Sequence, residues 1–152
     1  MRYIEAPTDY VAKPNDGYSI FLAGGITGCP DWQTAVVSML RMTPLTLFNP
    51  RRKDFPIHDP AAAEKQIRWE FDHLRRSDAV LFWFPKDTLC PIVLFELGAW
   101  SKNVDDAIYV GTEEGYPRTQ DVQLQLKFAR PDVEVVHSLT DLADQVKKDW
   151  LS

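Results

Sequence analysis

The sequence is poor in cysteine and histidine, and this excludes several kinds of site. Among 152 residues, only Cys29 and Cys90 are cysteines, which is too few for a disulfide scaffold or a zinc cluster. The three histidines, His58, His73 and His137, are scattered without metal-ligand spacing. We therefore expect no metal site and no cofactor.

The sequence also lacks long apolar runs and an excess of positive charge. No run approaches the length needed to span a membrane, and the first ten residues lack the apolar segment of a secretory signal. A net charge of -5 disfavours broad binding to nucleic acid polymers or anionic membranes, although it leaves room for a small local anion site. We expect a reduced, cytoplasmic protein whose partner is a small molecule.

What is present predicts one α/β domain over residues 1–152. The hydrophobic share of 45% and charged share of 26% are ordinary for a globular chain, and residues 1–17 read as an extended lead-in. Short apolar runs predict strands, and apolar residues at helical spacing predict helices between them. The expected strands are 18–23, 45–50, 79–84, 107–111 and 133–137, and the expected helices are 31–42, 60–76, 91–102, 119–129 and 140–150.

Five alternations of strand and helix favour a five-stranded parallel sheet with helices on both faces. The segment "AVLFWF" is apolar throughout, as a central parallel strand should be. The expected strand order is 2-1-3-4-5, which is flavodoxin-like or Rossmann-like. A ligand crevice then lies at the carboxyl ends of the first and third strands.

One carboxylate stands in an unexpected place. Glu96 lies inside the apolar stretch "IVLFELGAW", although an unpaired carboxylate is expensive to remove from water. A helix-start carboxylate is the alternative to a functional role, but Glu96 falls in the second turn of its helix. We favour the functional interpretation, because buried carboxylates concentrate at sites.

A second carboxylate, Glu70, borders the apolar stripe expected on helix 60–76. That stripe consists of Ala63, Ile67, Phe71 and Leu74. Glu70 is either a site residue or a surface partner of a nearby arginine, and its sequence context does not decide between them.

Three loops should converge beside Glu96. The loop "AGGITGCPDW" resembles a phosphate-cradling turn, although its glycines also suit a tight strand-to-helix turn. The pair Arg51-Arg52 either holds an anionic group or lies in a solvated loop. Cys90 begins a helix, where a thiolate would be favoured, but no histidine pairs with it by position, so a cysteine nucleophile is disfavoured.

These residues resemble a known family. The segments "IFLAGGITG", "FNPRR", "QIRWEFDHLRRSDAVLFWFP" and "CPIVLFELGAW", in this order over about residues 18–112, are similar to the nucleoside 2-deoxyribosyltransferase superfamily and to its divergent deoxyribosyltransferase-like branch. The resemblance implies a flavodoxin-like sheet and cleavage of the N-glycosidic bond of a 2′-deoxynucleoside or its 5′-monophosphate. Glu96 matches the family's nucleophile, and Glu70 matches an aspartate near the departing base.

The sequence departs from the family at two positions. Phe21 stands where the family has a tyrosine, and Cys90 stands where it has the aspartate or serine that recognises the 5′ end of the substrate. Asp87 and Thr88 are possible substitutes for that function. The family also completes its site with a neighbouring subunit, so a homo-oligomer is expected.

The predicted site therefore combines two catalytic carboxylates with residues of the three loops. We expect Glu96 to be ionised by its helix dipole and Glu70 to be kept neutral by desolvation. A nucleotide-binding sensor without turnover is the alternative function. The predicted substrate-binding residues are Phe21, Gly24, Gly25, Asp31, Trp32, Asn49, Arg51, Arg52, Asp87, Thr88 and Cys90.

Overall fold

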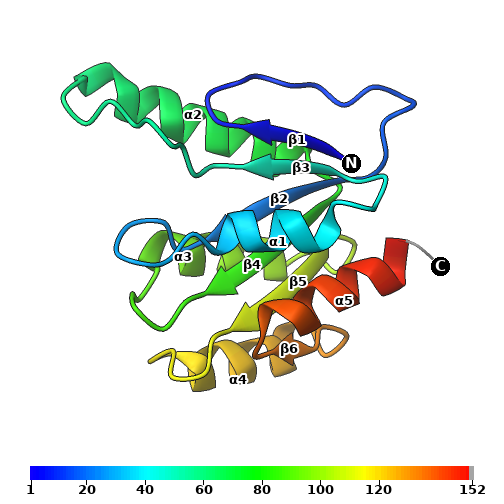
Figure 1. Cartoon of the computed structure of the whole chain (residues 1–152). Coiled ribbons are helices and arrows are strands. Elements are labelled where there is room, and N and C mark those ends of the chain that lie inside the picture. The colour runs from blue at the N-terminus through cyan, green and yellow to red at the C-terminus, as the bar shows by residue number, and fades with distance from the viewer. Residues whose placement is uncertain (151–152) are drawn as a thin grey trace.

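A computed structural model describes residues 1–150, which form a parallel sheet covered by helices on both faces (Figure 1). The strands are β1 (Arg2–Glu5), β2 (Ser19–Gly24), β3 (Thr46–Asn49), β4 (Ala79–Phe84), β5 (Ala107–Thr112) and β6 (Val135–Val136). The helices are α1 (Trp32–Leu40), α2 (Pro60–Arg76), α3 (Pro91–Ser101), α4 (Thr119–Ala129) and α5 (Leu139–Trp150). Within the described residues, no helix is long and apolar enough to cross a membrane.

The predicted α/β class and strand order are confirmed, but the predicted number of strands is wrong. The sheet has six strands in the order β1-β3-β2-β4-β5-β6, and each neighbouring pair is parallel. The additional strand, β1, lies within the expected lead-in and pairs with β3 from Arg2 opposite Thr46 to Glu5 opposite Asn49. It is an edge strand and stays partly exposed, so it lacks the apolar run that marked the other strands.

The core consists of two layers, one on each face of the sheet. Alternate side chains of a strand point to opposite faces, and β4 shows this clearly. Leu81 and Trp83 pack in the layer with α1 and α5, whereas Phe82 and Phe84 pack in the layer with α2, α3 and α4. All six residues of β4 are buried, which confirms its predicted central position.

The predicted apolar stripe of α2 is wrong for three of its four residues, and only Leu74 packs in the core. Ala63, Ile67 and Phe71 are exposed, with Ile67 at 65% and Phe71 at 48%, while Trp69 and His73 are buried beside the core. Both faces of the helix carry large side chains, so the apolar pattern alone could not show which one packs on the sheet.

The segment that precedes β2 explains this orientation of α2. The indole Nε1 of Trp69 donates a hydrogen bond to the Thr8 carbonyl oxygen at 2.8 Å. The Tyr10 main-chain N–H donates to Nε2 of His73 at 3.1 Å. The chain between β1 and β2 therefore covers the Trp69 and His73 face of the helix.

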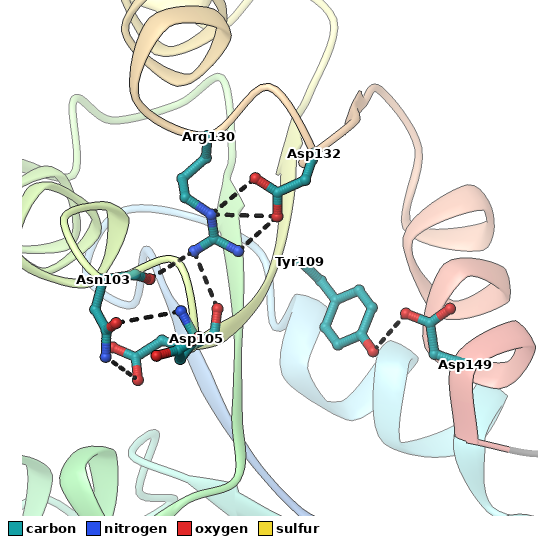
Figure 2. Close-up of polar contacts among 7 residues, drawn as sticks. Asn103, Asp105, Tyr109, Arg130, Asp132 and Asp149 are labelled. Carbon is teal, nitrogen blue, oxygen red and sulfur yellow. Dashed lines mark hydrogen bonds and ion pairs between the residues drawn. The ribbon is translucent and has the colours of Figure 1, made fainter.

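The opposite edge of the sheet is held by polar contacts (Figure 2). The buried guanidinium of Arg130, which follows α4, donates to the Asp132 carboxylate and to the Asn103 carbonyl oxygen after α3. The Tyr109 hydroxyl on β5 donates to Asp149 on α5 at 2.9 Å. The Arg130 contacts tie the end of α4 to the loop before β5, and the Tyr109 contact ties α5 to β5.

Candidate active site

A cavity of about 250 Å³ lies at the carboxyl ends of β2 and β4, where the strand order predicted a crevice. The loops after β2, β3 and β4 all reach it, together with α2 and α3. The cavity is partly open to the surface. Its lining residues are Phe21, Ala23, Gly24, Gly25, Ile26, Thr27, Pro50, Glu70, Thr88, Cys90, Pro91, Ile92, Val93 and Glu96.

Glu96 reaches the cavity from the second turn of α3. The helix presents Val93 and Leu97 to the core, and Glu96 lies at the border of that buried face, half-buried. Among the described residues, none donates a hydrogen bond to its carboxylate or lies within ion-pair distance of it. Glu96 is therefore a largely desolvated carboxyl without a protein partner, which is an unusual and costly arrangement.

Glu70 reaches the same cavity from the middle of α2. Its Oε1 accepts a hydrogen bond from Nε2 of Gln66, one helical turn earlier, at 2.8 Å. The charge of Glu70 acts on Glu96, so the two carboxyls are close enough to influence each other's protonation. The structure thus brings the two predicted catalytic carboxylates to one cavity.

Burial dominates the proton affinity of both carboxyls. Desolvation, followed by repulsion from Glu70, raises the pKa of Glu96 to about 7, and only the nearby charge of Arg75 lowers it. Desolvation also raises the pKa of Glu70, against the opposing effect of the Gln66 amide. Burial therefore opposes the expected ionisation of Glu96, and its pKa lies near neutrality instead of in the ordinary acidic range. Both shifts favour the protonated acid, and at neutral pH Glu96 is partly ionised and partly protonated.

Gly25 forms part of the cavity wall and has no room for a side chain. A Cβ atom there would lie 2.7 Å from Cγ of Pro85 and 3.0 Å from Sγ of Cys90. The Gly25 carbonyl oxygen accepts a hydrogen bond from Nε1 of Trp32 at 2.8 Å. Of the glycines in this loop, Gly28 alone has a positive φ, of 76°. Gly28 is therefore the glycine that the tight turn requires, whereas Gly25 is required by close packing.

Cys90 lines the cavity as the residue before α3. Its φ of 51° places it in the left-handed region, which is unusual for a residue with a side chain. Burial raises the pKa of its thiol to about 11, so the thiol stays protonated at neutral pH. This supports the sequence-based argument against a cysteine nucleophile.

Neither Arg51 nor Arg52 lines the cavity. Arg51 donates from its guanidinium to the carbonyl oxygens of Cys29 and Pro30 and to Oε1 of Gln33. Arg52 instead lies over the ring of Phe55, 5.4 Å from its centroid.

The other predicted binding residues outside the cavity also have identifiable contacts. Asp31 caps α1 by accepting from the Thr34 main-chain N–H. Asn49 is buried and accepts from the Arg51 main-chain N–H. Trp32 is buried behind Gly25, and Asp87 is exposed.

The sequence-based interpretation missed several residues of the site. Pro50, Thr27 and Ile26 line the cavity from the predicted loops, but nothing in their residue types indicated it. Gln66 could have been found, because a glutamine four residues before a glutamate lies beside it on a helix.

The fold and the cavity define a parallel α/β protein with a carboxylate pair at the switch point of the sheet. The model of one family, described as nucleoside 2-deoxyribosyltransferase like, matches residues 17–116. The chain therefore belongs to the nucleoside 2-deoxyribosyltransferase-like family, as the resemblance of its motifs implied. A search of curated proteins found no match.

Proposed function

We propose that the protein cleaves the N-glycosidic bond of a 2′-deoxynucleoside or its 5′-monophosphate, with Glu96 as nucleophile and Glu70 as its proton-donating partner. The observation that carries the proposal is the partnerless carboxyl of Glu96, which shares an apolar cavity with a second carboxyl. A carboxylate that is poorly hydrated is a better nucleophile toward an oxocarbenium-like carbon.

In the first step, an oxygen of ionised Glu96 attacks C1′ of the deoxyribose while the C1′–N bond breaks. The electron pair of that bond moves to the base nitrogen, and protonated Glu70 transfers its proton to the base. The reactive form therefore carries one proton on the pair, located on Glu70. Burial raises the pKa of Glu96 to about 7, so a substantial fraction of Glu96 is ionised at neutral pH, and burial raises the pKa of Glu70, which favours its acid form.

In the second step, water or another base attacks C1′ and releases Glu96. Glu70, now ionised, accepts the proton that the attacking group gives up. Attack by water makes the protein a hydrolase, and attack by a base makes it a transferase. Both outcomes use the same two residues.

The charges around the cavity favour an uncharged nucleoside over a 5′-monophosphate. Within the described residues, no lysine or arginine lines the cavity, and the guanidinium of Arg51 is occupied by carbonyl oxygens. Lys86, on the loop after β4, pairs with Glu113 at 3.3 Å. A phosphate in the cavity would therefore face the two carboxyls with no lysine or arginine in the lining, which supports the nucleoside as substrate.

The proposal is tested by measuring base release from a panel of 2′-deoxynucleosides and their 5′-monophosphates, with and without an acceptor base. We expect release from nucleosides in preference to monophosphates. Glu96→Gln should reduce release to near the detection limit, whereas Glu64→Gln, an exposed carboxylate on α2, should behave as wild type. Undiminished release by Glu96→Gln would show that Glu96 is not the nucleophile.

A nucleotide sensor without turnover is the second candidate. It is favoured by Phe21 and Cys90, which lack a strong hydrogen-bonding group at positions where the family has polar residues. A nucleoside at about 100 times its dissociation constant should stabilise either protein by roughly 2.7 kcal/mol. Thermal stabilisation without any base release would support the sensor and contradict the enzyme.

A homo-oligomer remains a proposal, supported by an apolar surface beside the cavity. Ile67 and Phe71 on α2, and Ile92 and Phe95 on α3, are all exposed, Phe95 at 76%. Exposed apolar groups gathered on neighbouring helices are typical of an interface. Gel filtration with light scattering tests this, and a monomer at all concentrations would contradict it. The cytoplasmic location also remains a prediction.

A further inference from the structure

The side chain of Gln66 connects Glu70 to the loop that follows β3. Its Nε2 donates one hydrogen bond to the Pro50 carbonyl oxygen at 2.8 Å and another to Glu70 Oε1 at 2.8 Å. Pro50 and Glu70 both line the cavity. The two protons of the amide are therefore both used, and both contacts lie at the edge of the site.

The orientation of this amide is determined by its partners. A main-chain carbonyl oxygen can only accept, so the Gln66 group that faces Pro50 must be the nitrogen. This leaves Oε1 of Gln66 buried and without a hydrogen-bond partner within the described residues. A methionine would fill similar space without an unpaired acceptor. What a glutamine contributes at position 66 is therefore its two N–H donors.

We propose that Gln66 is a positioning residue that holds Oε1 of Glu70 against its amide and leaves Oε2 as the oxygen that carries and transfers the proton. The proposal rests on the proposed function for the transfer, but the protonation site follows from geometry. An oxygen that accepts an amide N–H has less capacity to carry a proton than the free oxygen of the same carboxyl. The hydrogen bond from Gln66 to Oε1 thus determines that Oε2 of Glu70 carries the proton toward the departing base.

The same contact stabilises the ionised form of Glu70. A hydrogen bond donated to a carboxylate favours the anion, and the Gln66 amide opposes the effect of burial by lowering the pKa of Glu70. Removing the amide should therefore raise that pKa further. A residue that only tied α2 to β3 would not change the titration of the carboxyl.

The first test does not depend on activity. Carboxyl ¹³C NMR of the full chain, with the Glu70 resonance assigned through Glu70→Gln, should show a higher titration midpoint in Gln66→Met than in wild type. Gln123→Met is the matched control, because Gln123 also donates from Nε2, to His137 on another part of the surface, and should leave the midpoint unchanged. An unchanged midpoint in Gln66→Met would overturn the proposal.

A measurement on wild type covers the case in which Gln66→Met does not fold. The side-chain NH₂ resonances of Gln66 should shift with the same midpoint as the Glu70 carboxyl carbon. Resonances that stay constant while Glu70 titrates would overturn the proposal equally.

Kinetics then tests the catalytic consequence. In Gln66→Met, base release from unactivated nucleosides at pH 7 should fall roughly tenfold, a part of the 10²–10⁴-fold typical of general acid catalysis. The basic limb of the pH profile should move to higher pH, and an activated nitrophenyl-type leaving group should be little affected. Equal losses on both leaving groups would overturn the positioning role. If wild type releases no base at all, the proposed function fails, while the NMR titration still decides the role of Gln66.

Discussion

Replacing Glu96 with glutamine should stabilise the fold at alkaline pH, although it removes the proposed nucleophile. Glutamine has nearly the same shape as glutamate but carries no charge. The wild-type carboxyl has no hydrogen-bond partner among the described residues that the substitution could remove. What the substitution removes is the cost of holding a charge in an apolar cavity beside Glu70.

The magnitude follows from the pKa of Glu96, which burial raises from an ordinary 4.5 to about 7. The folded protein binds this proton more tightly than the unfolded chain. The contribution of Glu96 to the free energy of unfolding is therefore fully present below about pH 4.5 and is lost as the pH rises through about 7. At about 1.4 kcal/mol per tenfold change in the equilibrium constant, the loss reaches roughly 3.5 kcal/mol. Partial exposure of the carboxyl makes this an upper bound.

Urea unfolding of wild type and Glu96→Gln at pH 5.5 and pH 8.5 measures this difference. The variant should exceed wild type by about 2–3 kcal/mol at pH 8.5 and by clearly less at pH 5.5. Glu64→Gln, on the exposed face of α2, should show no such pH-dependent gain. Equal stability of Glu96→Gln and wild type at pH 8.5 would refute the view that Glu96 is a strained, desolvated carboxyl.

Three further predictions follow from the described contacts. Gly25→Ala should cost about 1–3 kcal/mol in urea unfolding, because its Cβ would crowd Cys90; a neutral effect would show that the loop can move. Burial lowers the pKa of His73, and its Nε2 accepts a hydrogen bond from the Tyr10 main-chain N–H. Its NMR titration midpoint should therefore lie below 6.5, and its contribution to the free energy of unfolding should be lost as the pH falls. A midpoint above 6.5 would contradict this. Asp31→Ala should cost about 1 kcal/mol through loss of the α1 cap, and an unchanged unfolding midpoint would count against the cap.

The sequence predicted the parts of the fold that depend on local pattern. Strands such as 79–84 are apolar throughout, and α2 begins and ends where the pattern placed it. It did not predict β1, because an edge strand buries little surface and needs no apolar run. It also gave α2 the wrong buried face. Ile67 and Trp69 are both apolar, and only packing by a distant segment decides between them.

The candidate site was predicted in the same uneven way. Glu96 was placed at the cavity because a carboxylate among apolar residues is conspicuous in a sequence, whereas Glu70 was placed there by the resemblance to the family. Arg51 was placed at the ligand from its charge, but its guanidinium is satisfied by carbonyl oxygens of the loop after β2, a contact between segments that no local pattern reveals. The balance between dipole and burial at Glu96 also depends on the surrounding packing.

The segment between β1 and β2 supports α2, so removing it by truncation should affect the site. The family match begins at residue 17, yet Thr8 and Tyr10 hold Trp69 and His73, and Asp9 pairs with Arg76 at 2.7 Å. A truncation at the family boundary would keep every residue of the cavity and still remove the outer support of α2. The helix would then expose an indole and an imidazole, and the carboxyl that it carries into the cavity would lose its fixed distance from Glu96.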